Sequence, residues 1–277
     1  ITMNARRLAG SILLCGATLV AAVVMWPRSE ETKSTRPRTY EEIVRSGIIR
    51  ATTEYNSVGF HVDHDTIAGF HYELFQAFAR DKGLQAEIIP EMELNTQLEG
   101  INHGTFDIIA GSLLITSEQK DSLLLFSHPI LLNRQVLVQR KPQSEQDTAY
   151  IAQQLQLAQK TVYLPEGSPV KYRIHNLSAE IADTIYVKEL PKYGSEQLMA
   201  LVAHGDIDYA ICEESIAKRL IGQYPQLDID TAISFNQFYG WGVSKESQAL
   251  LDTLNAWLDS YKDTSSFKKL LKKYDLQ

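Results

Sequence analysis

The sequence predicts an α/β protein with two lobes, each a mostly parallel sheet flanked by helices. From Tyr40 onward, short β-like runs alternate with amphipathic stretches of helical period, which is typical of an open parallel sheet. One local pattern also occurs twice, since "INHGTFDIIAG" at Ile101 is echoed by "VAHGDIDYAIC" at Val202. These two observations together indicate two lobes.

The first lobe is expected to have the order β-α-β-α-β. It opens with a strand in "GIIRATTEY". The next stretch, "AGFHYELFQAFARDKG", predicts a helix because Phe70, Leu74 and Phe78 recur at four-residue spacing and Gly83 supplies a left-handed stop. A strand in "LQAEIIP" follows, and then a helix in "LNTQLEGINHG", whose buried face holds Leu94, Leu98 and Ile101. The buried strand "FDIIAGSLL" completes the unit.

The second lobe repeats part of this order. The strand "KTVYL" and the turn "PEG" precede a helix that begins at Ser168, with Pro169 in its first turn. In both copies of the repeated pattern a glycine closes a helix and an aspartate opens a strand: Gly104 with Asp107, and Gly205 with Asp208. The chain ends in two helices, the first of which lines one face with Leu251, Leu254 and Leu258.

The composition bounds the class of protein. The chain has 277 residues, of which 44% are hydrophobic, so it can bury one or two large cores. A net charge of -7 leaves no broad basic surface, and no nucleic-acid partner is expected. The two cysteines are Cys15 and Cys212. The first lies in an apolar run near the start, so the soluble part has one thiol and no internal disulfide, and Cys212 in "YAIC" is expected in the core.

Residues 1–27 read as a signal or a membrane anchor. The run Leu8–Trp26 is uncharged and long enough to approach the hydrocarbon core of a bilayer, and Arg6 and Arg7 precede it. The positive-inside rule then places the rest of the chain outside the cytoplasm, anchored to the inner membrane on the periplasmic side. Cleavage after Ala22 and a lipoprotein attached through Cys15 stay open as alternatives. Residues 28–38 form a polar linker.

The order of these segments from residue 47 to the end resembles the bacterial extracellular solute-binding proteins of the amino-acid-transporter type. The segments that carry the resemblance include "NHGTFDIIAGSLLITSEQ", "LLFSHP", "PEGSPVKY", "HGDIDYAICEE" and "FKKLLKKYDL". Within the family the chain is most similar to the solute-binding-like half of membrane-bound lytic transglycosylase F. The resemblance implies the type 2 periplasmic binding protein fold, with crossing strands near residues 136–141 and 238–244. Lobe I would comprise 39–138 and 242–277, and lobe II would comprise 139–241.

Two helix starts are expected to face the cleft between the lobes, because ligands of open α/β sheets bind outside the carboxyl ends of strands. The turn at Gly167 and Ser168 offers backbone N–H groups that suit a carboxylate or a phosphate, or else is an ordinary helix cap. Thr116 offers a second start, and its spacing from Gln119 fits a capping box that needs no ligand.

The resemblance implies the remaining site residues. Ser112 belongs to the ligand-binding loop of the first lobe, in which amino-acid binders have a hydroxyl and an arginine where this chain has Leu114 and Gln119. Neither residue can copy the bidentate grip of arginine on a carboxylate, so weak or no binding of free α-amino acids is expected. Glu213 matches the acid that meets an α-amino group. Three further matches are Glu54, a contact for basic side chains, and Ser57 and Phe60, at the cleft wall.

Three other sequence features suggest metal binding or catalysis. The run "HVDHD" at residues 61–65 has metal-ligand residue types but is better explained as a polar hairpin turn, so no metal and no cofactor is expected. Glu214 and Ser215 match the start of the lytic transglycosylase motif without its glycine-rich continuation. A dehydratase with its active site in the cleft stays an alternative, because a few members of the fold use a cleft carboxylate for catalysis and Glu213 could supply one.

The expected function is therefore a non-catalytic, monomeric envelope protein that clamps a small polar ligand by hinge motion, for transport or sensing. The ligand is an amino-acid-like molecule, a peptide or a muropeptide, and a membrane permease or a cell-wall enzyme is the expected partner. A regulatory module of cell-wall metabolism that senses muropeptides or peptides is one alternative, and the dehydratase is the other.

Overall fold

The computed structural model describes residues 36–115 and 124–276. Residues 35–277 form one compact unit. The expected signal or anchor, most of the expected linker, and the expected helix start at Thr116 with Gln119 lie outside the described residues. Within the described ranges, no helix is long and apolar enough to cross a membrane.

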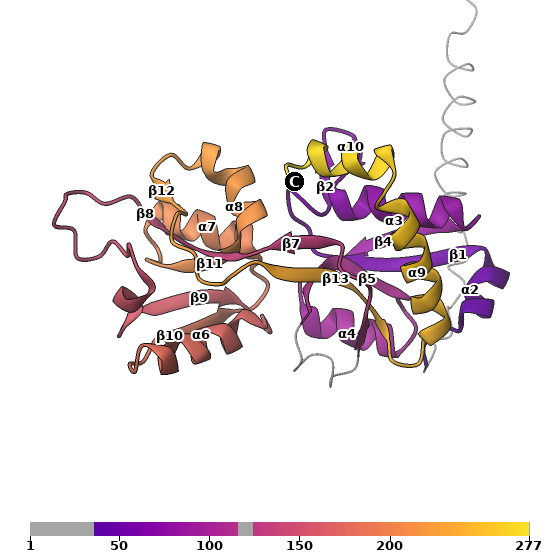
Figure 1. Cartoon of the computed structure of the whole chain (residues 1–277), viewed down its shortest axis with the longest axis horizontal. Coiled ribbons are helices and arrows are strands. Elements are labelled where there is room, and N and C mark those ends of the chain that lie inside the picture. Colours follow the sequence, from indigo (N-terminus) through magenta and orange to yellow (C-terminus); the bar gives the residue numbers. More distant parts are fainter. Residues whose placement is uncertain (1–35, 116–123, 277) are drawn as a thin grey trace, which may run out of the picture. The chain divides into compact units, whose positions relative to one another are not determined.

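Lobe I is built on a mixed sheet with the strand order β4-β1-β5-β13-β6, and β7 also pairs with β13. Its strands are β1 (Ile48–Thr53), β4 (Gln85–Pro90), β5 (Ile108–Leu114), β6 (Leu124–Phe126), β7 (Leu131–Asn133) and β13 (Gln237–Ser244). The first three are parallel, whereas β13 runs antiparallel to β5, β6 and β7 (Figure 1). The short hairpin of β2 (His61–Asp63) and β3 (Thr66–Ala68) contains the "HVDHD" run, as the sequence predicts.

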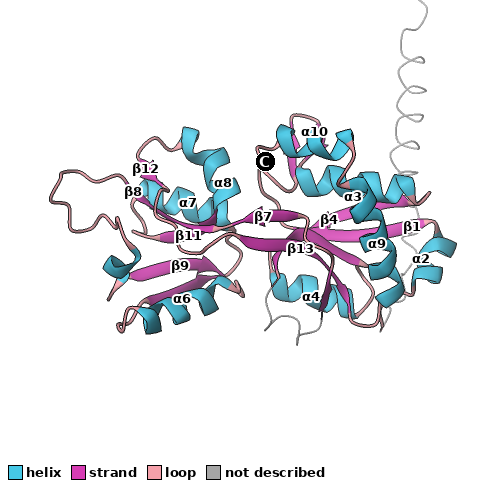
Figure 2. Ribbon diagram, viewed as in Figure 1, coloured by secondary structure: helices cyan, strands magenta, loops and turns pink. Residues whose placement is uncertain are grey.

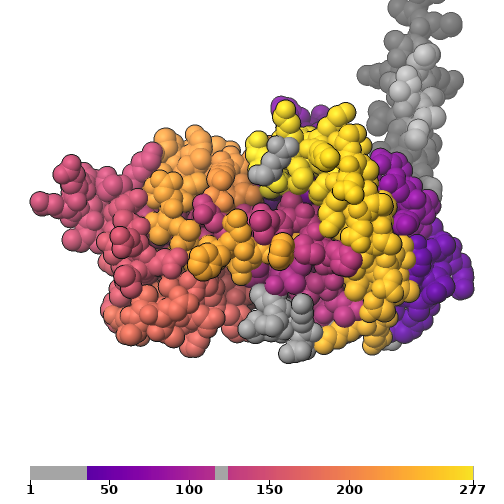
Figure 3. Space-filling model, viewed as in Figure 1, coloured from indigo at the N-terminus to yellow at the C-terminus, as the bar shows by residue number. Residues whose placement is uncertain are grey.

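The helices of lobe I are α2 (Tyr40–Ser46), α3 (Phe70–Asp81), α4 (Leu94–Asn102), α9 (Gln248–Tyr261) and α10 (Ser265–Lys273). The predicted apolar face of α3 is fully buried against the sheet together with Trp241, and Gly83 ends that helix with a positive φ of 69°. Figure 3 shows α9 and α10, at the yellow end of the colour scale, along the side of lobe I. In α4, Leu94 and Leu98 are only half-buried, because this helix borders a pocket.

Lobe II repeats the sheet order of lobe I as β10-β9-β11-β8-β12. Its strands are β8 (Gln135–Arg140), β9 (Thr161–Pro165), β10 (Tyr186–Leu190), β11 (Ala210–Glu213) and β12 (Leu227–Asp228). Its helices are α6 (Val170–Glu180), α7 (Ser195–His204) and α8 (Glu214–Leu220), with short 3-10 turns at η1 (Gln154–Leu157) and η2 (Ile221–Gln223). Figure 2 shows α6 and α7 on opposite faces of this sheet. Cys212 is buried in the core, as expected.

The chain crosses between the sheets a few residues earlier than the sequence indicates. β7 belongs to the sheet of lobe I and β8 belongs wholly to that of lobe II, so the first crossing lies at Arg134. All of β13 lies in lobe I, and residues 231–234 still bond to β8, so the return crossing lies near 235–236. The sequence could not locate these points, because "ILLNRQVLVQR" reads as one uninterrupted strand-like run.

The repeated aspartates perform the same structural task in both lobes. Asp107 pairs with Arg38, whose Nε lies 3.0 Å from the carboxylate, and the Asp107 side chain is only 1% exposed. Asp208 pairs with Arg140, which also donates to the carbonyl oxygens of Val202 and Ile207. Each arginine therefore fastens the turn between a helix and its strand. Arg38, assigned to the linker by sequence, is part of lobe I.

Candidate functional site

The carboxyl ends of the parallel strands of both sheets converge on a cavity of about 80 Å³. From lobe I it is lined by Glu54, Met92, Leu94, Ser112, Leu113, Leu114 and Tyr239. From lobe II it is lined by Gln135, Pro165, Glu166, Ser168, Pro169, Val170, Ser195, Ile211 and Glu213. This is the place where ligands of open α/β sheets bind, so the cavity is the candidate site.

Two carboxyl groups from opposite lobes dominate the electrostatics of the cavity. Glu54 directly follows β1, and Glu213 ends β11. Glu54 keeps exposed surface but lines the cavity, so protein atoms confine the water around it, and this desolvation raises its pKa to about 7. Burial raises the pKa of Glu213 to about 8, with repulsion from Glu54 as the second cause. Both groups therefore exchange protons near neutral pH.

A chain of hydrogen bonds leads from the core of lobe I to Glu213. Trp241 Nε1 donates to Nδ1 of His71 at 3.0 Å, and Nε2 of His71 lies 3.1 Å from Oγ of Ser112. Because an indole N–H only donates, Nδ1 of His71 must accept, and the neutral ring then carries its proton on Nε2. Nε2 therefore donates to Ser112, which is left free to give its own proton to Glu213. The bonds from Ser112 and from Asn133 Nδ2, 3.2 Å away, favour the ionised form of Glu213.

Burial keeps the histidine in this chain neutral. His71 is 3% exposed, and desolvation lowers its pKa to about 3. Neither the histidine nor the tryptophan touches the cavity, so both are positioning residues for Ser112. This arrangement could not be predicted from the sequence, because His71 lies within an apolar helix pattern and Trp241 lies within a strand.

The turn before α6 does not present the free N–H groups that the sequence analysis expects. Gly167 N donates to the carboxylate of Glu189 at 2.9 Å, and Ser168 N donates to the carbonyl oxygen of Pro165. Oγ of Ser168 accepts from Val170 N at 3.4 Å, which is a cap-like contact, and the next two N–H groups bond within the turn. The helix itself begins at Val170. The carboxylate of Glu189 therefore occupies the place at this turn where the carboxylate or phosphate of a ligand was expected.

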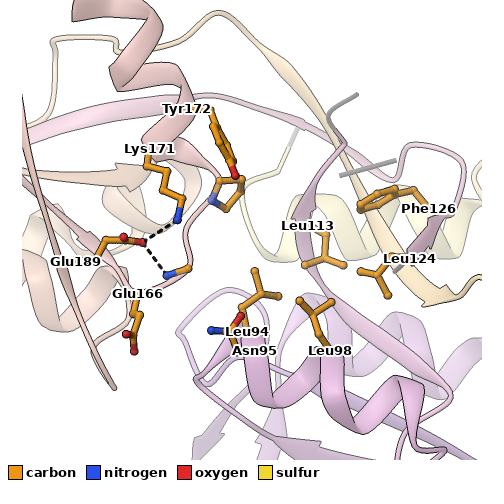
Figure 4. Close-up of a pocket in the computed structure, with 12 residues that line it drawn as sticks. Leu94, Asn95, Leu98, Leu113, Leu124, Phe126, Glu166, Lys171, Tyr172 and Glu189 are labelled. Carbon is orange, nitrogen blue, oxygen red and sulfur yellow. Dashed lines mark hydrogen bonds and ion pairs between the residues drawn. The ribbon is translucent and has the colours of Figure 1, made fainter. Parts of the chain in front are cut away.

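A second pocket of about 390 Å³ adjoins the cavity and shares four lining residues with it, Leu94, Leu113, Glu166 and Pro169. Figure 4 shows its apolar wall, formed in lobe I by Leu94, Leu98, Leu113, Leu124 and Phe126. Across from that wall, Lys171 lies 3.6 Å from Glu189, so its positive charge is paired. The combined space therefore has Glu54 and Glu213 in the smaller cavity and a largely apolar lobe I wall in the larger pocket.

Of the three remaining predicted residues, only one lines the cavity. Leu114 is buried and lines the cavity with an aliphatic side chain. The Ser57 N–H donates to Glu196 of lobe II at 2.7 Å, so it is a contact between the lobes. Phe60 is 4% exposed and packs edge-on against Tyr55 and Tyr72, and it does not line the cavity.

Some lining residues had no sequence signal. Gln135 and Tyr239 come from the strands next to the crossings, and the amide of Gln135 donates to the Tyr239 hydroxyl at 2.7 Å. Ser195 enters at the start of α7. Gln135 was missed because the first crossing was predicted to begin one residue after it.

The "HVDHD" run and the pair of Glu214 and Ser215 have structural roles. His64 pairs with its neighbour Asp63 in the hairpin turn, and no group of three potential metal ligands occurs in residues 36–115 and 124–276. Glu214 pairs with Arg134 at 2.8 Å and with Lys218 at 3.0 Å, while Ser215 accepts from Asn133. These two residues hold the start of α8.

Residues 48–277 match the family of bacterial extracellular solute-binding proteins, family 3. The chain belongs to this family. Two curated relatives of this solute-binding protein are membrane-bound lytic murein transglycosylases F. The one from Desulfosudis oleivorans is 27% identical over 84% of the chain and 50% of its own length. The one from Pseudomonas fluorescens is 21% identical over 86% of the chain and 48% of its own length. The chain thus spans about half the length of these relatives.

Solved structures place the fold of this family 3 protein among amino-acid-binding proteins. Holo ArgBP from T. maritima matches with a TM-score of 0.68 and 22% identity, covering 85% of this chain and 99% of that one. A substrate-binding protein of an amino acid ABC transporter from Streptococcus pneumoniae, bound to L-arginine, matches with a TM-score of 0.70 and 21% identity, covering 86% and 99%. These matches confirm the predicted two-lobed fold.

Proposed function

We propose that the chain is a non-catalytic, periplasmic binding protein that holds a small polar ligand between its lobes, for uptake or for sensing. The observation that carries the proposal is the cavity itself, which takes lining residues from the carboxyl ends of strands in both sheets and holds one acid from each lobe. Membership of the solute-binding family supports the same role.

Ligand binding is testable by stability, because a ligand that binds only the native state raises the melting temperature. The full chain, in detergent solution, would be screened against amino acids, short peptides, muropeptides and alkyl amines. We expect one class to raise the melting temperature in a concentration-dependent way. No shift with any class at millimolar concentration would contradict a binding function.

Sensing within cell-wall metabolism is the second candidate, since the curated relatives are named as murein transglycosylases and the chain corresponds to half of their length. A muropeptide would then be the ligand that raises the melting temperature, and a wall enzyme would be the partner. Recovery of a permease instead, after crosslinking in cells, would favour uptake.

A cleft dehydratase is the third candidate. One structural neighbour is an ancestral amino acid-binding protein, a precursor of cyclohexadienyl dehydratase, with a TM-score of 0.71 and 20% identity over 86% of this chain and 99% of that one. Carboxyl groups with pKa values of about 7 and 8 suit general acid-base chemistry at neutral pH. Turnover of a prephenate-like acid, abolished by Glu213→Gln, would establish the enzyme and overturn the non-catalytic proposal.

A further inference from the structure

The charges around the cavity are unbalanced. Glu54 and Glu213 line it from opposite lobes, and Glu166 lines both the cavity and the second pocket. Among its described lining residues none is lysine, arginine or histidine. When both acids ionise, their two negative charges repel each other. Such a site gains most from a ligand that brings positive charge.

A ligand carboxylate, in contrast, finds no unpaired cationic side chain among the described residues that line the two pockets. Leu114 presents only an aliphatic side chain to the cavity. The N–H of Gly167 already donates to Glu189, and the ammonium group of Lys171 already pairs with the same carboxylate. A carboxylate at this turn would have to displace Glu189, and it would lie close to the acids of the cavity.

The shape of the site indicates the rest of the ligand. The cavity shares Leu94 and Leu113 with the larger pocket, whose lobe I wall is apolar apart from Asn95. An alkyl chain starting between the two acids would run along this wall and bury its methylene groups there. A metal ion is disfavoured, because the described residues hold no group of three potential ligands.

We propose that the cavity binds an organic cation, an alkyl amine or alkyl guanidine without an α-carboxylate, whose positive group lies between Glu54 and Glu213. This assignment rests on the proposed binding function and names its ligand class. Glu54 and Glu213 each supply carboxylate oxygens that accept from the N–H groups of the ligand, and Ser112 orients Glu213 for this task.

The test compares two probes that differ only in the carboxylate, agmatine and L-arginine, with 1,4-diaminobutane as a second cation. Affinities are measured by calorimetry on the full chain at pH 8. Agmatine is expected to bind on the order of tenfold more tightly than L-arginine. Glu54→Gln and Glu213→Gln should each weaken agmatine binding by about tenfold or more. Glu99→Gln, the same change on the exposed side of α4, serves as the matched control and should leave affinity unchanged.

The outcomes separate this assignment from the binding function. If L-arginine or an uncharged peptide binds more tightly than both cations, the ligand class is wrong and the binding function stands. If the cations bind but both glutamine variants bind them equally well, the placement between the acids is wrong. If no probe of any class binds, both proposals fail. Melting temperatures without ligand show that each variant is folded, and replacing a carboxylate that resists ionisation by an amide is expected to preserve the fold.

Discussion

The indole N–H of Trp241 donates to Nδ1 of His71 at 3.0 Å. This bond determines which group donates and which accepts in the hydrogen bonds between His71 and the cavity. With Nδ1 occupied as an acceptor, Nε2 of His71 carries the proton and Ser112 receives it as a hydrogen bond. Two buried side chains of lobe I thereby determine that Ser112 meets Glu213 as a donor.

Trp241→Phe should release this arrangement. The buried Nδ1 loses its donor, and the free energy of unfolding should fall by about 2 kcal/mol. Nitrogen NMR of the native protein should show a neutral His71 protonated on Nε2 at pH 5, because its pKa is about 3. Trp257→Phe is the matched control, since that indole donates to Asp81, which lies at the surface. Protonation of His71 at pH 5 in the unaltered protein would contradict the proposed direction of the chain.

Glu213→Gln should stabilise the protein in a manner that depends on pH. The native pKa of Glu213 is about 8, well above the value of an exposed glutamate, so the native state holds a proton that the unfolded chain has released. The free energy of unfolding of the unaltered protein should therefore decrease as pH rises from about 4.5 to 8. The variant has no carboxyl group at this position and does not lose stability in this way. Its free energy of unfolding should therefore exceed that of the unaltered protein only slightly at pH 5 and by the largest amount above pH 8. Chemical denaturation at several pH values measures the difference, and parallel curves for both proteins would refute the shifted pKa.

The affinity for a cation should rise with pH, whereas the stability of the free protein should fall. At pH 6 both cavity acids hold their protons, and a positively charged ligand must displace them. The affinity for agmatine should therefore increase as pH rises through about 7 and 8. Burial raises the pKa values of Cys212 and Tyr239, the further titratable groups that interact with Glu213, so both stay protonated in this range. Calorimetry in buffers of different ionisation enthalpy should detect protons released on binding near pH 7. An affinity that is constant from pH 6 to 9 would mean that the cation does not contact these acids.

Arg38→Ala should be far more harmful than its neighbour Arg36→Ala. The first change leaves the carboxylate of Asp107, 1% exposed, without its charged partner, and should cost about 3 kcal/mol of unfolding free energy. Arg36 pairs with Glu42 at the surface, where side chains that are 55% and 36% exposed stay hydrated, so little change is expected. Urea unfolding of both variants measures the contrast. Equal stabilities would show that the pair of Arg38 and Asp107 does not stabilise lobe I.

The layout of the fold could be predicted from sequence because local patterns encode it. The four-residue spacing of Phe70, Leu74 and Phe78 predicts the buried face of α3, and the glycine and aspartate pairs of the two repeats predict where each helix gives way to its strand. The crossings could not be located in the same way. A strand that changes sheets at Arg134 has the same apolar pattern before and after that residue.

Part of the candidate site could be predicted from sequence, since Glu54, Ser112, Leu114, Ser168 and Glu213 line the cavity. Their contact with a ligand stays a prediction. Phe60 packs against Tyr55 and Tyr72 instead of facing the cavity, which depends on neighbours that no local pattern reveals. The raised pKa values of the two acids also arise from tertiary structure, since they come from enclosure and from the approach of residues 159 positions apart.

The central position of β13 has a consequence for the order in which the molecule is assembled. This strand joins β5 to β6 and β7 in lobe I, yet the ribosome makes it after all five strands of lobe II. Lobe II can therefore complete its sheet while lobe I still has an unpaired edge along β5. More than one hundred residues separate Leu114 from Gln237, so the emerging chain carries this open edge throughout the synthesis of lobe II. An unpaired strand edge attracts other strands, and the half-made chain is thus the form most exposed to misassembly.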